Sequence, residues 1–117
     1  MQSMIIRAEQ MKAFEERAAK QRDSELIRYA RGRFPDYFAA HSPDEMAEFC
    51  SAVRKMATKL LITEESDVAT VLDLTVMYGP EFPADPWTSD VFAVADWSGP
   101  EKMDVIRSRV RRQLADF

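Results

Sequence analysis

The chain has 117 residues, of which 46% are hydrophobic and 31% are charged, with 16 basic against 20 acidic side chains. A length of this order suits one compact domain, so we expect a single domain over residues 1–117. The single cysteine, Cys50, excludes an internal disulfide framework. No apolar run approaches the roughly 20 residues that cross a bilayer, and no signal-peptide core opens the chain, so we expect a cytoplasmic protein without a membrane partner.

The charge is distributed unevenly along the chain. Residues 1–33 carry a net charge of +3, residues 34–100 carry −9, and residues 101–117 carry +2. A strongly acidic middle is a poor match for a phosphate backbone, so we expect no nucleic-acid partner. The basic tail has two interpretations: a solvated helix face, or docking onto an acidic partner or onto the chain's own acidic middle. Its members are Arg107, Arg109, Arg111 and Arg112.

The first half of the chain predicts two helices. Residues 4–33 contain strong helix formers until Gly32 and Pro35 end the pattern, which indicates one long helix. The sequence Ser-Pro-Asp-Glu at residues 42–45 combines an N-cap, a first-turn proline and the glutamate of a capping box. It therefore predicts the start of a second helix, whose apolar face includes Cys50.

The second half of the chain predicts a third helix, a loop and two further helices. The third helix is expected from an N-cap at Thr63 to a C-terminal glycine at Gly79. Three prolines in residues 79–87 exclude regular helix there and indicate a structured loop. A short helix over about residues 87–95 and a last helix capped at Ser98 follow. We expect an all-α fold of four to five helices, with a long N-terminal helix and a Pro-rich structured loop.

The residues that most often perform chemistry are too few for a recognisable site. His41 is the only histidine and Cys50 the only cysteine, and Cys50 lies on an apolar helix face where a thiol usually acts as a small hydrophobe. The three glycines fit no phosphate-binding or dinucleotide-binding motif. We therefore expect no catalytic residue, no cofactor, no metal site and no enzymatic activity.

Apolar side chains instead suggest a surface that binds protein. Ile5, Ile6, Met11 and Phe14 make the N-terminal half of the first helix apolar on more than one side, which favours contact with a copy of itself or a different chain. Phe82 and Trp87 lie in or beside the Pro-rich loop. They have two interpretations, an interface role or packing of the loop onto the helices.

Three stretches carry a family resemblance: residues 5–16, residues 62–74, and residues 72–87 with their Tyr-Gly-Pro-Glu-Phe and Asp-Pro-Trp sequences. They resemble small helical co-chaperone-like proteins encoded beside type VI secretion adaptor, PAAR spike and effector genes of Gram-negative bacteria. The resemblance implies a protein that partners an adaptor chaperone while a toxic effector is loaded onto the spike. It supplies no catalytic residues.

The functional expectation is thus a non-enzymatic bacterial co-chaperone that binds an adaptor chaperone, a secreted effector, or both, and that forms a homodimer in one version of the hypothesis. The alternative is an immunity protein whose acidic middle neutralises a basic toxin. A small enzyme is the third and least supported class.

Overall fold

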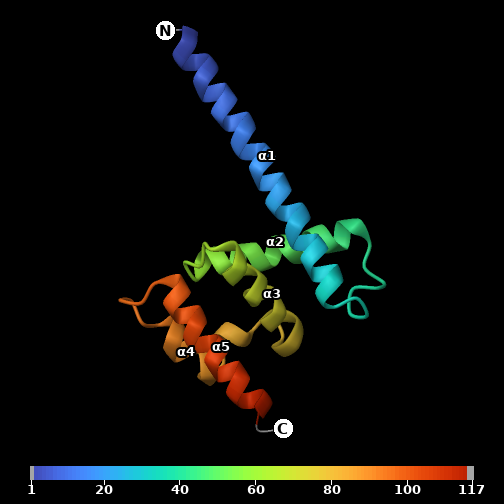
Figure 1. The fold of residues 1–117 in the computed structure, drawn as a ribbon, viewed down its shortest axis with the longest axis vertical. Coiled ribbons are helices and arrows are strands. Elements are labelled where there is room, and N and C mark those ends of the chain that lie inside the picture. The colour runs from blue at the N-terminus through green and yellow to red at the C-terminus, as the bar shows by residue number, and fades with distance from the viewer. Residues whose placement is uncertain (1, 116–117) are drawn as a thin grey trace. The chain divides into compact units, whose positions relative to one another are not determined.

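The computed structural model describes the backbone of residues 2–115 and the side chains of residues 8–115. Within that part of the chain every regular element is helical, so the all-α prediction, with its long first helix, is confirmed (Figure 1). The elements are α1 (Gln2–Arg33), α2 (Pro43–Lys59), α3 (Glu65–Tyr78), the 3-10 helix η1 (Phe82–Ala84), α4 (Pro86–Phe92) and α5 (Gly99–Ala115).

The chain divides into two compact units, residues 1–50 and residues 51–117, with the division inside α2. We call them unit 1 and unit 2 and describe each by itself. The single domain expected from the length of the chain stays a prediction.

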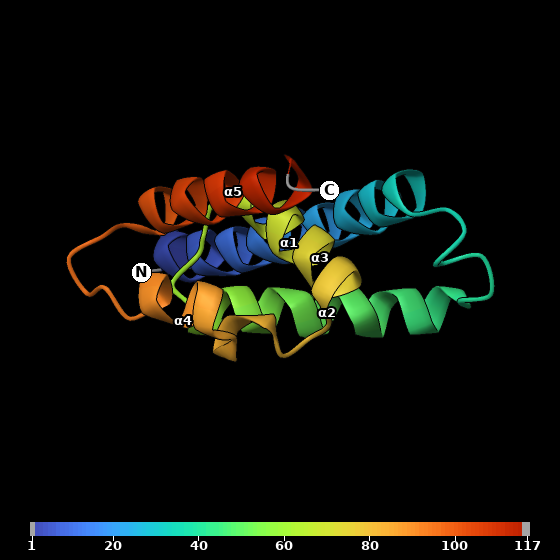
Figure 2. The same cartoon turned by 90° about the horizontal axis from the view of Figure 1, so that it is seen from below.

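Unit 1 is built around Phe38, in the connection between α1 and α2. The Phe38 ring is fully buried and meets the Phe49 ring edge-on, with the centroids 5.1 Å apart. The Arg31 guanidinium donates hydrogen bonds to the carbonyl oxygens of Phe38 (3.3 Å) and His41 (3.0 Å). Figure 2 shows this connection as an open loop from the end of α1 to the start of α2. The Arg31 side chain therefore provides hydrogen bonds to two loop carbonyl oxygens that accept none from a helix backbone.

Both predicted capping boxes are present. The Glu45 N–H donates to Ser42 Oγ (3.1 Å), and the Ser42 N–H donates in return to Glu45 Oε1 (3.1 Å). The hydrogen bond from the Ser42 backbone N–H to the Glu45 carboxylate is the main reason that the pKa of Glu45 lies below its usual value. Ser98 and Glu101 repeat the arrangement at the start of α5. Each box satisfies N–H groups that a helix start leaves unpaired.

The C-terminus of α2 closes with a Schellman motif that uses leucine where glycine is usual. The Ile62 N–H donates to the Ala57 carbonyl (2.8 Å) and the Leu61 N–H to the Thr58 carbonyl (3.1 Å). This geometry holds Leu61 at φ 62°, in the left-handed region, with 74% of the residue exposed. A Cβ added at Gly99 would lie 2.9 Å from the Leu61 carbonyl oxygen, so the start of α5 approaches this turn too closely for a side chain.

We expect Leu61→Gly to stabilise the protein by about 0.5–1 kcal/mol. An L-residue in the left-handed region costs about 1–2 kcal/mol, part of which the greater unfolded-state freedom of glycine offsets. The exposed Leu61 side chain contributes little burial that could be lost. Urea unfolding measures the change, and Leu61→Ala is the matched control, because it removes the same side chain and keeps the strain. Equal effects of the two variants would contradict this explanation.

Unit 2 packs α5 against α3 and α4, and both α3 and α4 against η1. Its core is formed by apolar side chains from these elements, from the end of α2 and from the turn after it: Val53, Ala57, Ile62, Val68, Val71, Leu72, Leu74, Phe82, Val91, Met103 and Ile106. The predicted cap of α3 at Thr63 is wrong by one residue. Glu64 is the N-cap, because its carbonyl accepts the first helical hydrogen bond, from the Val68 N–H (2.9 Å), while its own backbone stays extended.

The Pro-rich loop is ordered by contacts of its own. Gly79 begins it at φ 94° and donates its N–H to the Thr75 carbonyl (3.0 Å), which ends α3. Further on, the buried Thr88 hydroxyl donates to the carbonyl oxygen of Phe82 and lies 3.1 Å from that of Asp85. These bonds tie the first turn of α4 to η1, so the prediction of a structured loop is confirmed. The exclusion of regular helix over residues 79–87 is wrong at its end, because α4 already begins at Pro86, where a first-turn proline is tolerated.

Two arginines of the basic tail dock onto the acidic middle of the chain. Arg107 pairs with Asp67, a carboxylate on the buried side of α3, and donates to the Thr70 hydroxyl (3.1 Å). Arg109 binds both oxygens of Asp90 (2.7 and 3.0 Å) and the Trp87 carbonyl (2.6 Å). The Arg109 hydrogen bond is the main cause that lowers the pKa of Asp90.

The solvated-face interpretation of the tail is therefore wrong for Arg107 and Arg109, because both reach carboxylates of neighbouring helices. Arg111 and Arg112 lie on the exposed side of α5. Lys102, earlier in the same helix, adds a third attachment by donating to the Phe92 carbonyl (3.2 Å) at the end of α4. A cation is well placed there, since the last carbonyls of a helix carry partial negative charge.

Candidate protein-binding surface

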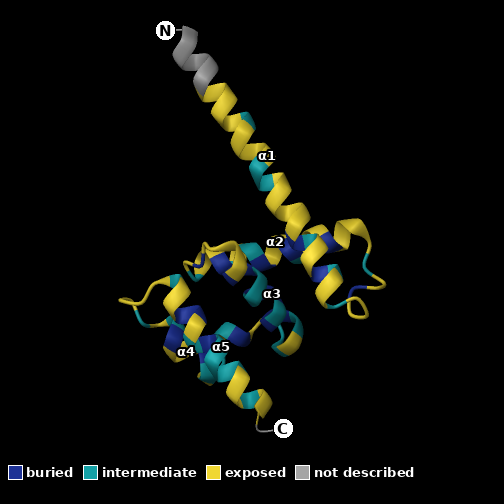
Figure 3. Ribbon diagram, in the orientation of Figure 1, coloured by how far each residue is buried: buried dark blue, intermediate teal, exposed yellow. Residues whose placement is uncertain are grey.

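The longest uncovered part of unit 1 is the stretch of α1 over residues 8–25. No residue of this stretch is buried (Figure 3), and Leu26 is the first buried residue among the described side chains of α1. At 1.5 Å per residue the stretch is about 27 Å long. A helix of this length gains little stability without packing of one face. It therefore presents a long, mostly exposed helical surface within unit 1.

Two large apolar side chains stand on this stretch, one turn apart. Met11 is 61% exposed and Phe14 is 70% exposed, which makes Phe14 one of the two most exposed large hydrophobic residues described. Ala18 follows one turn after Phe14 on the same side of the helix. We call Met11, Phe14 and Ala18 the α1 stripe. Its shape is two bulky groups followed by a small one.

The remaining surface of the stretch is polar and partly self-satisfied. Arg17 Nε donates to the Ala13 carbonyl (3.4 Å), and the Gln21 amide donates to Glu25 Oε1 (3.3 Å). These contacts lie within one helix and hold side chains along its axis. Charged groups therefore border the α1 stripe, as a polar rim borders the apolar centre of a protein interface.

The other sequence-predicted site residues differ in how far the structure buries them. The side chains of Ile5 and Ile6 lie outside the described residues. Phe82 is completely buried in unit 2, with its ring 6.4 Å from that of Phe92, so it presents no surface to a partner as folded here. Trp87 is half-buried, with its ring 5.0 Å from that of Tyr78. For Phe82 the structure therefore agrees with the second interpretation of the sequence, in which the ring packs the loop onto the helices.

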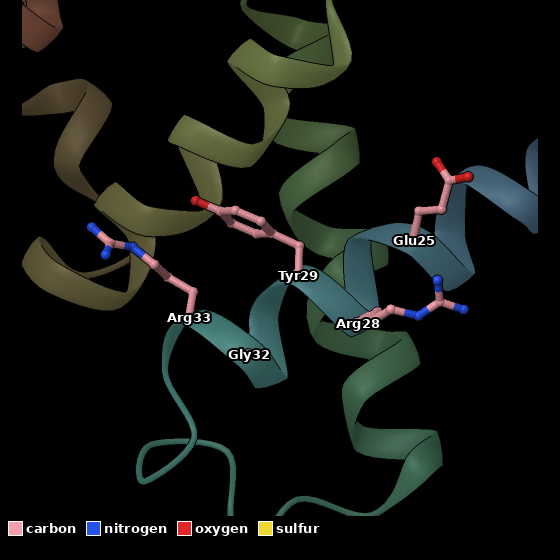
Figure 4. Close-up of a pocket in the computed structure, with 5 residues that line it drawn as sticks. All are labelled: Glu25, Arg28, Tyr29, Gly32 and Arg33. Atoms are coloured by element: carbon pink, nitrogen blue, oxygen red, sulfur yellow. The ribbon is translucent and has the colours of Figure 1, made fainter.

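An open hollow lies on α1 just after the stripe, lined by side chains of that helix alone: Glu25, Arg28, Tyr29, Gly32 and Arg33. Figure 4 shows Tyr29 and Arg33 projecting to one side of the helix and Glu25 and Arg28 to the other. No residue lies opposite to close the hollow within this set. Its form is that of a contact surface rather than an enclosed small-molecule site.

The two residues considered for chemistry occupy different environments in unit 1. Cys50 is buried, as its place on the apolar face of α2 predicts. His41 stacks on Tyr37, with the ring centroids 5.8 Å apart, and its Nδ1 is buried without a hydrogen bond. Among the described residues no three His, Cys, Asp or Glu side chains gather closely enough to hold a metal ion.

Sequence reasoning missed the carboxylate that Arg107 binds. Asp67, Val71 and Leu74 share one side of α3 by helical spacing, and all three are buried. A carboxylate that shares helical spacing with buried apolar residues indicates that a cationic side chain from another element pairs with it. Asp73, which interrupts an apolar run and so draws attention in the sequence, is half-buried instead.

Comparison with known proteins adds no assignment. No family model matches the chain, and neither the curated proteins nor the solved structures contain a match. None of the helices in the described part of the chain combines the length and the apolarity that crossing a membrane requires.

Proposed function

We propose that this protein is a non-enzymatic co-chaperone of type VI secretion, which binds an adaptor chaperone through the α1 stripe during effector loading. The carrying observation is that Met11 and Phe14 lie uncovered on a helical stretch with no buried residue. An exposed amphipathic helix is the element that inserts into an apolar groove of a partner. The secretion pathway itself rests on the sequence resemblance described above.

The energetics of such an interface favour the α1 stripe as its centre. Burying a large apolar side chain contributes about 1.5–3 kcal/mol, and aromatic residues supply much of the binding energy in protein interfaces. The charged residues that border the stripe suit the rim, where their contribution is smaller. Phe14 is therefore the principal anchor that we assign to the partner.

The double variant Met11→Asp, Phe14→Asp is expected to weaken adaptor binding by at least about 100-fold, because roughly 3 kcal/mol or more of apolar burial is lost. Helicity should stay near that of the wild type, since both side chains are exposed. Calorimetric titration of purified adaptor measures the affinity, and circular dichroism measures the helicity. Lys20→Asp is the matched control, since it also changes the net charge by two and lies on the other side of α1.

If the double variant binds adaptor with full affinity, the α1 stripe is not part of the interface. If the Lys20→Asp control loses as much affinity as the double variant, net charge is the cause. The partner itself is identified by tagging the protein in its native host and analysing what co-purifies by mass spectrometry. An adaptor, with or without effector, supports the proposal. Recovery of the protein without any partner contradicts it.

The immunity alternative receives less support from the arrangement of charge in unit 2. Three carboxylates of the acidic middle already pair with arginines of the same unit: Glu65 with Arg54 (2.8 Å), Asp67 with Arg107, and Asp90 with Arg109 (2.7 Å). Fewer free negative charges then face a basic toxin. Recovery of a toxin alone, together with protection of cells that express it, would favour immunity over co-chaperone function.

A further inference from the structure

The sulfur-bearing side chains of the described part of the chain differ widely in their exposure to solvent. Met11 is 61% exposed and Met77 is 42% exposed, whereas Met56 is half-buried. The buried sulfur-bearing residues are Met46, Met103 and Cys50. Because the oxidation of side-chain sulfur follows its accessibility, a dissolved oxidant reaches Met11 before the other described sulfur atoms.

We propose that Met11 is an oxidation site that regulates the α1 stripe: hydrogen peroxide converts its thioether into a sulfoxide, and the sulfoxide weakens adaptor binding. The peroxide O–O bond breaks, one oxygen atom forms a bond to the Met11 sulfur, and water leaves. The sulfur is oxidised by two electrons and the peroxide is reduced by two. The consequence for adaptor binding rests on the proposed function, whereas the site of oxidation does not.

The position of Met11 makes its oxidation a change in binding rather than in folding. In the free protein the sulfoxide oxygen stays in water, because the Met11 side chain is exposed. In the complex the same oxygen lies near Phe14 in the apolar centre of the interface, where a polar acceptor that has lost its water and gains no hydrogen bond is unfavourable. The cost therefore falls on the complex alone, and the affinity decreases.

Burial protects the interior of each unit from the same oxidant. Met46 of unit 1 and Met103 of unit 2 are both fully buried, and a sulfoxide at either position would place a polar group inside a packed core. Their sulfur atoms become accessible only when the chain opens, so mild oxidation leaves both units folded. Methionine sulfoxide reductases reverse the modification at Met11, which makes the change in binding a switch rather than permanent damage.

The site of oxidation is tested on the purified protein alone. After addition of hydrogen peroxide, peptide mass spectrometry should show Met11 oxidised at least about tenfold faster than Met46 and Met103, with an unchanged circular dichroism spectrum. Unfolding in urea should remove the difference, because it exposes every sulfur atom. Equal oxidation rates of Met11 and Met46 in the folded protein would overturn the proposal.

The effect on binding is tested by calorimetric titration of purified adaptor before and after peroxide treatment. The wild type should bind about tenfold more weakly after treatment, and methionine sulfoxide reductases should restore its affinity. Met11→Leu forms no sulfoxide at this position, so its affinity, whatever the value before treatment, should not change on treatment. Met77→Leu is the matched control, because it removes the other exposed thioether and should lose affinity on oxidation as the wild type does.

The outcomes separate this inference from the proposed function. If the untreated wild type does not bind adaptor, the proposed function is wrong, and the regulation of that binding falls with it. If the untreated wild type binds and the protein oxidised at Met11 binds equally well, the regulation alone is overturned. Equal losses of affinity for the oxidised wild type and the oxidised Met11→Leu variant would assign the effect to another sulfur atom and would also overturn it.

Discussion

Replacing Arg107 by leucine is expected to lower the free energy of unfolding of unit 2 by about 3 kcal/mol. Asp67, the partner of Arg107, is only 4% exposed, while the arginine side chain retains 29% exposure. Removing the cation leaves a buried carboxylate with no opposite charge, and breaking a buried ion pair from one side typically costs about 3–5 kcal/mol. The partial exposure of Arg107 places the expected loss at the lower end. Urea unfolding followed by far-ultraviolet circular dichroism measures it.

The controls separate the ion pair from other effects of losing an arginine. Arg111→Leu removes an equal charge from the exposed side of the same helix and should change stability by less than about 0.5 kcal/mol. The double variant Asp67→Leu, Arg107→Leu should recover most of the loss, because two apolar side chains replace a buried pair at little net cost. If the double variant is as unstable as Arg107→Leu, the unpaired Asp67 carboxylate is not the cause.

Phe82→Ala is expected to destabilise unit 2 by about 3–4 kcal/mol. The ring is fully buried, and large-to-small changes at such sites lose both the transfer free energy of the ring and the contacts around the cavity that remains. Phe14→Ala provides the matched comparison, because it deletes the same side chain from an exposed position. Its effect on stability should stay below about 0.5 kcal/mol, while binding to a partner through α1 weakens.

The same unfolding measurement compares the two phenylalanines. Equal and small losses for both variants would show that the interior of unit 2 collapses around the missing ring. A large loss for Phe14→Ala alone would show that α1 is packed in solution. The expected pattern, a large loss at Phe82 and a small one at Phe14, assigns one ring to the core and the other to the surface.

The features that sequence predicts well are those in which one residue meets another three or four positions away. The capping boxes at Ser42 and Ser98 connect residues three apart, so the local sequence contains both partners. The same holds for Gly79, which ends α3 by donating its N–H to the Thr75 carbonyl four residues before it. The misplaced cap of α3 shows the limit of such signals, since Thr63 and Glu64 are neighbours and only the backbone geometry decides between them.

Contacts between distant residues were only loosely predictable. Arg107 and Asp67 are 40 residues apart, and Arg109 and Asp90 are 19 apart, so composition indicates opposite charges without indicating which of them meet. For this reason the sequence alone leaves two interpretations of the tail, a solvated helix face and docking onto carboxylates. Similarly, an aromatic residue in a loop has the same sequence signature whether it packs inward, as Phe82 does, or stays half-exposed, as Trp87 does.

Both tryptophans of the chain, Trp87 and Trp97, belong to unit 2. Intrinsic fluorescence excited at the indole band therefore reports on unit 2 alone, whereas circular dichroism sums the helices of both units. Trp87 contacts Tyr78, and Trp97 is 40% exposed, so the two emitters also differ in solvent access. Coincident fluorescence and dichroism transitions would mean that the two units unfold cooperatively, and separate transitions would give each unit its own stability from one unmodified sample.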